Sequence, residues 1–149
     1  MISKAEKISL QLERQIKAPR DRVYAAWAEP SQLKQWFGPD KVKTRNLLAD
    51  VRPGGEFRWD LTSPDGEEMT ARGEYQEIVP GRKISFSWSW DDDENWENRE
   101  SLVTITFEDK AGGTLVRLTH EKLPSEQSRD NHSQGWNSLL DKLEQFATR

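Results

Sequence analysis

The middle of the chain alternates apolar and polar residues with a period of two, and turn-forming residues interrupt the alternation at short intervals. The clearest run is 84–90, in which four large apolar residues alternate with three serines. Residues 57–61 and 103–107 alternate in the same way. Each run predicts a strand with one buried face, because successive side chains of a strand point to opposite sides. The turns between them, of which the proline and two glycines within 52–55 are the clearest, predict consecutive hairpins and an antiparallel meander.

Four further runs are predicted to be extended. Residues 8–16 alternate and predict a half-buried first strand. Residues 42–51 and 67–79 predict two more strands, the second of them polar, and 113–120 predicts the last strand. The chain therefore predicts a sheet of six or seven strands.

Helices are predicted on both sides of this region. Pro19 begins a first short helix, since proline is tolerated at the first helical position, and Val23 and Trp27 lie on its apolar face. Pro30 restarts the chain as a second short helix that ends at residues 38–39 (Gly-Pro). Both short helices follow the first strand.

One long helix closes the chain. Either Ser125 or Ser128 can cap its beginning, and apolar residues recur from Trp136 at helical spacing. Gly135 costs about 1 kcal/mol relative to alanine inside a helix, and we expect close approach of the helix backbone to the sheet to explain it. The pattern predicts one α+β domain over residues 1–149, in which a curved sheet grips the closing helix and encloses a cavity.

Composition excludes several classes of protein. The chain has no cysteine, which excludes disulfides and thiolate metal sites. It has no apolar run of the length that a membrane span requires, and no apolar secretory segment at its start, so we expect a cytoplasmic protein. With two histidines and no recognisable metal-ligand spacing, we predict neither a metal nor a cofactor.

Charge argues against nucleic acid as a partner. The net charge is −4, and the basic residues are scattered rather than gathered on one face. Residues 91–94 form an acidic run that lacks the glycine and the ligand spacing of a calcium loop. We interpret this run as a solvated hairpin tip.

The ordered motifs resemble those of a known family. The phrases that match are 18–19 (AP), 23–27 (VYAAW), 29–33 (EPSQL), 36–39 (WFGP), 52–55 (RPGG), 64–66 (PDG), 73–75 (GEY), 103–107 (VTITF), 113–114 (GT), and 135–136 (GW) with Leu140 and Leu143. In this order they resemble the START-like (SRPBCC) superfamily, and within it the homologues of the activator of the heat-shock-protein-90 ATPase. The resemblance implies a helix-grip fold of the birch-pollen-allergen type. It also implies three functional classes: carriers of hydrophobic ligands, co-chaperone domains and cyclase-like enzymes.

Aromatic residues on the predicted inner faces are the candidates for contact with a ligand. Seven tryptophans are a high count for 149 residues, and indole rings suit a flat or long apolar molecule. The alternative is that these rings only fill a core. The predicted cavity residues are Trp27, Trp36, Phe37, Phe57, Trp59, Tyr75, Phe86, Trp88, Trp90, Ile105, Leu118, His120, Trp136 and Leu140.

The two histidines and the charged strand residues are the candidates for catalytic groups. His120 shares a strand face with Val116 and Leu118, so it is placed at the cavity wall, where it either orients a ligand, moves a proton, or is satisfied by a neighbour. His132 is expected to be exposed on the first turns of the closing helix. Charged residues such as Arg58 and Asp60 fall on the outer face, where cross-strand ion pairs are the simplest account.

Three functions remain open from the sequence. The first is binding of a small hydrophobic or aromatic molecule between the sheet and the closing helix. The second is an interaction or co-chaperone-like role, with a protein partner contacting the hairpin at 91–100. The third is a cavity enzyme of the cyclase type that uses His120. We expect a monomer or a weak homodimer.

Overall fold

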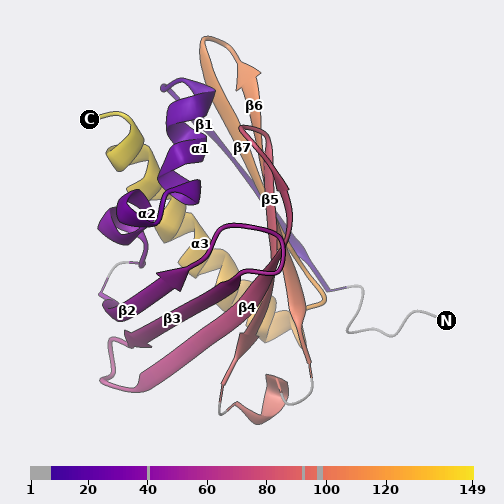
Figure 1. Cartoon of the computed structure of the whole chain (residues 1–149). Helices are drawn as coiled ribbons and strands as arrows, with labels where there is room; N and C mark the ends of the chain where they lie inside the picture. The colour runs from indigo at the N-terminus through magenta and orange to yellow at the C-terminus, as the bar shows by residue number, and fades with distance from the viewer. Residues whose placement is uncertain (1–7, 40, 92, 97–98) are drawn as a thin grey trace, which may run out of the picture.

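The computed structural model describes residues 8–39, 41–91, 93–96 and 99–149 and shows a curved sheet with helices on one face (Figure 1). The strands are β1 (Leu10–Ile16), β2 (Lys43–Ala49), β3 (Glu56–Thr62), β4 (Glu68–Val79), β5 (Lys83–Trp90), β6 (Ser101–Lys110) and β7 (Gly113–Glu121). The helices are α1 (Arg20–Ala28), α2 (Pro30–Trp36) and α3 (Glu126–Ala147), with a 3₁₀ turn, η2 (Glu94–Trp96).

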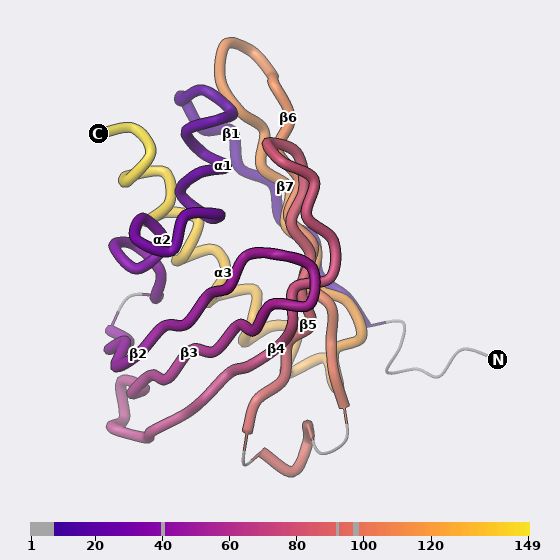
Figure 2. The backbone as a smooth tube through the Cα atoms, viewed as in Figure 1, coloured from indigo at the N-terminus to yellow at the C-terminus, as the bar shows by residue number. Residues whose placement is uncertain are grey.

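The seven strands form one antiparallel sheet in the order β1-β7-β6-β5-β4-β3-β2. The predicted meander is confirmed from β2 to β7, and β1 completes the sheet by pairing with β7. The backbone trace shows how strongly β2, β3 and β4 turn away from the other strands (Figure 2). This curvature gives the sheet a concave face.

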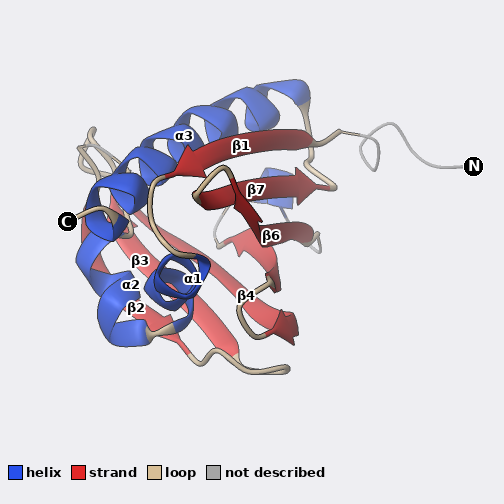
Figure 3. Cartoon of the chain, turned by 90° about the horizontal axis from the view of Figure 1, so that it is seen from above, coloured by secondary structure: helices blue, strands red, loops and turns tan. Residues whose placement is uncertain are grey.

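Helix α3 lies along that concave face (Figure 3). Its apolar stripe is buried through Leu139, Leu140 and Leu143, as the helical spacing predicts. The C-terminal end of α3 lies beside α1 and α2 (Figure 1), and Arg22 Nη2 donates to the carbonyl of Arg149 over 3.0 Å. The N-terminal half of α3 is therefore the part that α1 and α2 leave uncovered.

The curvature has a local cause in β4. A side chain at Gly73 would place its Cβ 1.7 Å from the carbonyl oxygen of Ser87, so only glycine allows β4 and β5 to approach this closely. The pairing of the two strands also shifts register between Tyr75 and Glu77. Such a bulge bends a strand and increases its twist.

The helix boundaries differ slightly from those expected. Pro19 is the N-cap of α1 rather than its first helical residue, because its backbone is extended and helical geometry begins at Arg20. Pro30 is the first residue of α2, as predicted. Of the two serines considered for α3, Ser125 is the cap, and its hydroxyl accepts a hydrogen bond from the backbone N–H of Ser128 over 3.0 Å.

Candidate functional site

A pocket of about 970 Å³ lies between the N-terminal half of α3 and the ends of β3, β4 and β5. Five of the seven tryptophans line it, namely Trp59, Trp88, Trp90, Trp96 and Trp136. Leu61, Met69 and Leu139 add aliphatic surface. Its size is that of a small-molecule site, and its lining combines these apolar side chains with polar ones such as Ser125, Gln127 and Asn131. We call it the tryptophan pocket.

The tryptophan rings form one connected cluster. The ring centroid of Trp88 lies 5.3 Å from that of Trp136 and 5.5 Å from that of Trp90. Trp90 lies 6.2 Å from Trp59. These distances and the tilted or edge-on orientations are those that aromatic pairs favour. The pocket wall is thus held by ring-to-ring packing rather than by isolated side chains.

The two histidines sit within this cluster, each accepting a hydrogen bond from an indole. Trp136 Nε1 donates to His120 Nδ1 over 3.1 Å, and Trp90 Nε1 donates to His132 Nε2 over 3.0 Å. The imidazole rings are 5.0 Å apart and nearly perpendicular. An imidazole nitrogen that accepts carries no proton, so these contacts fix the neutral form of each ring.

The opposite nitrogen of each ring also has a partner. His120 Nε2 lies 2.7 Å from Ser101 Oγ, and that hydroxyl donates to the carbonyl of Trp88. His132 Nδ1 lies 2.7 Å from the backbone carbonyl of Ser128. Both imidazoles are therefore fully satisfied, and for His120 this agrees with the simplest of the three roles considered from the sequence.

Burial keeps both rings neutral. It lowers the pKa of His120 well below the ordinary value, and the neighbouring His132 adds to the effect. Burial also lowers the pKa of His132, against the hydrogen bond to the Ser128 carbonyl, which raises it. The pocket wall consequently has no imidazolium charge at neutral pH.

The predicted exposure of His132 is wrong. It was expected to be exposed, but it is half-buried and lines the tryptophan pocket. Its position four residues before Trp136 places both side chains on one helix face, and this spacing was the signal for its true location.

Trp96 is a pocket residue that the sequence analysis did not predict. The acidic run around it suggested a solvated hairpin tip, yet Trp96 is 4% exposed, lines the pocket and packs its ring 5.7 Å from that of His132. Residue 92 of that run, and residues 97–98 after Trp96, lie outside the described residues. The connection between β5 and β6 therefore contributes Trp96 to the pocket wall.

Gly135 has a different role from the one expected. A Cβ added there would meet nothing within 4 Å, so close approach to the sheet is not the reason for glycine. Gly135 lines the pocket instead. A side chain at this position would extend into open space rather than into a packed interface.

One polar atom in the pocket wall has no partner among the described residues. Trp88 is 2% exposed, and its indole N–H makes no hydrogen bond to any of them. A buried donor without a partner costs about 1–3 kcal/mol. A ligand acceptor atom that reached it would supply the missing bond.

The predicted cavity residues separate into two groups. Four of them line the pocket: Trp59, Trp88, Trp90 and Trp136. Ten lie outside its lining and are buried in the core: Trp27, Trp36, Phe37, Phe57, Tyr75, Phe86, Ile105, Leu118, His120 and Leu140. On each strand the residues nearer the pocket end are the ones that line it.

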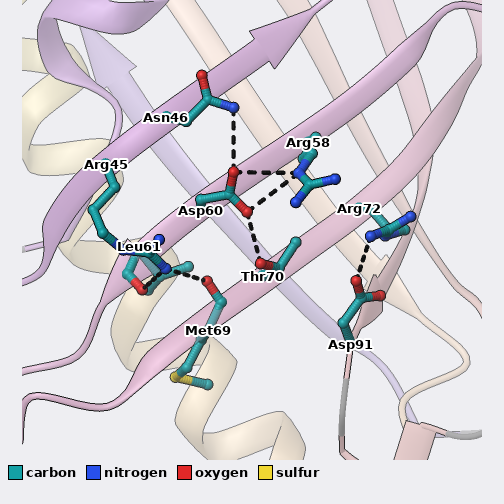
Figure 4. A network of polar contacts seen from close by, with 9 residues as sticks. All are labelled: Arg45, Asn46, Arg58, Asp60, Leu61, Met69, Thr70, Arg72 and Asp91. Carbon is teal, nitrogen blue, oxygen red and sulfur yellow. Dashed lines mark hydrogen bonds and ion pairs between the residues drawn. The ribbon is translucent and has the colours of Figure 1, made fainter.

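The outer face of the sheet carries a separate polar network around Asp60 (Figure 4). Its carboxylate accepts from Thr70 Oγ1 at 2.6 Å and from Asn46 Nδ2 at 3.2 Å, and it pairs with Arg58 at 3.2 Å. The hydrogen bond from Thr70 is the main reason that the pKa of Asp60 is lowered. Arg72 pairs with Asp91. The carboxylates of Asp60 and Asp91 are thus paired with groups of the same face, which supports the structural account of these charges.

Two kinds of feature are not found in the described part of the chain. It holds no group of three or more histidine, cysteine, aspartate or glutamate side chains arranged for a metal ion. Among its helices, none is long and apolar enough to cross a membrane.

A curved antiparallel sheet around a long C-terminal helix, with a pocket between them, defines the helix-grip class of START-like proteins. The model of the family described as activator of Hsp90 ATPase homolog 1-like protein matches residues 17–148. The chain belongs to this family.

Solved structures agree with this assignment. A protein of Chromobacterium violaceum is 26% identical, with 95% of this chain and 99% of that chain covered and a TM-score of 0.82. The AHSA1 protein of Silicibacter pomeroyi is 26% identical, with coverage of 93% and 96% and a TM-score of 0.80. A putative uncharacterized protein of Rhizobium leguminosarum is 30% identical, with 95% of each chain covered and a TM-score of 0.78. No curated protein sequence matches the chain significantly.

Proposed function

We propose that the protein binds a small, largely apolar aromatic molecule in the tryptophan pocket. The observation that carries this proposal is the pocket of about 970 Å³ whose wall contains five tryptophans. The pocket is partly open to solvent, and the rings in its wall offer apolar surface that such a molecule would cover. Carriers of hydrophobic ligands are one of the functional classes that the START-like resemblance implies.

The two alternatives have less support. An acid–base role for His120 requires a free nitrogen, but its side chain is 0% exposed and both nitrogens have protein partners. A protein-docking role would be favoured by a large exposed apolar patch. Among the described residues the exposed large apolar side chains are Leu48 and Val79, on different strands.

The binding proposal is tested with the seven indole N–H signals of a ¹H–¹⁵N spectrum. Titration with naphthylmethanol, a neutral aromatic probe, should shift the signals of the five pocket tryptophans saturably. Trp27 and Trp36 lie outside the pocket lining and serve as internal controls. Absence of shifts, or equal shifts in all seven signals, would contradict the proposal.

Gly135 allows a second test with two variants, of which one is expected to raise the unfolding free energy and the other to weaken binding. The Gly135→Ala variant should gain up to about 1 kcal/mol in unfolding free energy, because alanine favours the helix and its methyl group meets no neighbour. The Gly135→Leu variant should fold and bind naphthylmethanol at least about tenfold more weakly, since its side chain occupies pocket volume.

Urea denaturation measures the first effect and the indole titration measures the second. Asn137→Leu is the matched control, because Asn137 is exposed on α3 and lies outside the pocket lining. Unchanged binding by Gly135→Leu would show that the ligand does not occupy this part of the pocket.

A further inference from the structure

The charged side chains that line the tryptophan pocket are all acidic. Three carboxylates belong to its lining: Asp65, Glu67 and Asp93. The described residues that line it include no lysine or arginine. The pocket therefore presents three negative charges and no positive side chain to a ligand.

These carboxylates are not neutralised by the protein. No ion pair joins any of the three to another described residue. Asp93 accepts a hydrogen bond from the backbone N–H of Asn95 over 3.0 Å, which leaves its charge in place. Asp65 and Glu67 are exposed in the turn between β3 and β4, and Asp93 is half-buried after β5. The three thus lie on two connections at the pocket end of the sheet.

Arg45 donates to the backbone carbonyls of the lining residues Leu61 and Met69 over 2.9 and 3.4 Å, without itself lining the pocket. The histidines of the aromatic cluster are neutral at pH 7, because burial lowers the pKa of each. The N-terminus of α3, at the pocket, contributes the equivalent of about half a positive charge. Ser125 already caps it and Glu126 lies in its first turn, so this contribution is outweighed by three carboxylates.

The aromatic wall favours the same kind of ligand. The face of an indole ring is negative and attracts a cation within about 6 Å of the ring centroid, more strongly than the other aromatic side chains do. Trp90 is half-buried in the wall, and its ring belongs to a cluster that also contains Trp59 and Trp88. Apolar rings and unpaired carboxylates together are complementary to an apolar body that carries a positive charge.

We infer that the ligand of the tryptophan pocket is an organic cation, an aromatic or hydrophobic amine or quaternary ammonium, whose charge lies at the mouth beside Asp65, Glu67 and Asp93. This inference rests on the proposed binding function and specifies its ligand class. It excludes fatty acids and other carboxylates as preferred ligands, because their charge would face three carboxylates of the same sign.

Three probes with one ring system and different charges test the inference. They are naphthylmethyltrimethylammonium, naphthylmethanol and naphthoate, titrated into the full chain while the indole signals of the five pocket tryptophans are followed. The cation should bind at least about tenfold more tightly than the anion at low ionic strength, with the neutral alcohol between them. Added salt should reduce the difference, because the carboxylates at the mouth are accessible to screening ions.

A triple variant, Asp65→Asn, Glu67→Gln and Asp93→Asn, assigns the effect to the three carboxylates. It should bring the cation and anion affinities to within about threefold of each other, and it should change naphthylmethanol binding less than cation binding. Two of the positions are exposed and the third keeps an acceptor for the Asn95 N–H, so folding should be retained.

The outcomes separate the inference from the proposed function. Equal affinities, or tighter binding of naphthoate with shifts at the pocket tryptophans, would overturn the charge selectivity and leave the binding site intact. A cation preference that persists in the triple variant would overturn the role of these carboxylates. No binding of any probe would overturn both the inference and the proposed function.

Discussion

The Trp88→Ala variant is expected to lose about 3–5 kcal/mol of unfolding free energy, the range observed when a large buried aromatic side chain is truncated. Trp88 is 2% exposed and lies at the centre of the aromatic cluster. Its ring contacts Phe57 at 5.7 Å, Trp90 at 5.5 Å and Trp136 at 5.3 Å between centroids. Removing it leaves a cavity that extends the tryptophan pocket into the core. Urea denaturation measures the loss.

A conservative pair of variants separates the ring from its N–H group. Trp88→Phe keeps an aromatic ring and removes an N–H that has no partner among the described residues, so no hydrogen bond is lost. Trp36→Phe is the matched comparison, because Trp36 Nε1 donates to the buried carbonyl of Ala26 over 2.9 Å. Trp36→Phe should therefore cost about 1 kcal/mol more than Trp88→Phe. A loss below about 1 kcal/mol for Trp88→Ala would show that the cluster is not packed as described.

The sheet and the helices could be predicted because their signals are local. A strand such as β5 shows its two faces in the alternation of residues 84–90, and α3 shows its buried stripe in the spacing from Trp136 onward. The turns were marked by proline and glycine. What the local pattern left out was the bend of the sheet at β4, which depends on the approach of Gly73 to the carbonyl of Ser87 on the neighbouring strand.

The division between core and pocket could not be predicted from the same signals. Phe86 and Trp88 share one face of β5, yet Phe86 belongs to the core and Trp88 lines the pocket. The difference is their distance from the end of the strand, where α3 begins and where α1 and α2 no longer cover the sheet. Trp96 was missed for a related reason, since its burial depends on how the connection after β5 packs against His132 on α3. Such contacts join segments far apart in the sequence.

Acidification is expected to destabilise the fold through the two neutral histidines. The folded-state pKa values of His120 and His132 are lowered, so below the ordinary histidine value of 6.5 the unfolded chain binds protons that the folded chain does not. Stability is therefore complete above that pH and falls as the pH decreases toward the folded-state values. One such group contributes up to about 1.4 kcal/mol between pH 7.5 and 5.5. We expect a loss of about 1.4 kcal/mol from the fully buried His120. The half-buried His132 should add a further loss of up to about 1.4 kcal/mol.

Variants that keep the accepting atom but cannot titrate isolate this effect. Asn at 120 and Gln at 132 each place an amide oxygen where the accepting imidazole nitrogen lies, toward Trp136 Nε1 and Trp90 Nε1 respectively. Urea denaturation of His120→Asn at pH 7.5 and 5.5 should show the fall in stability reduced by about 1.4 kcal/mol relative to the parent chain. The double variant should be nearly independent of pH in this interval, because the lowered pKa of Asp60 acts only in more acidic solution. A parent chain as stable at pH 5.5 as at pH 7.5 would mean that the folded protein takes up protons at these rings, and the paired indole–imidazole hydrogen bonds would then be incorrect.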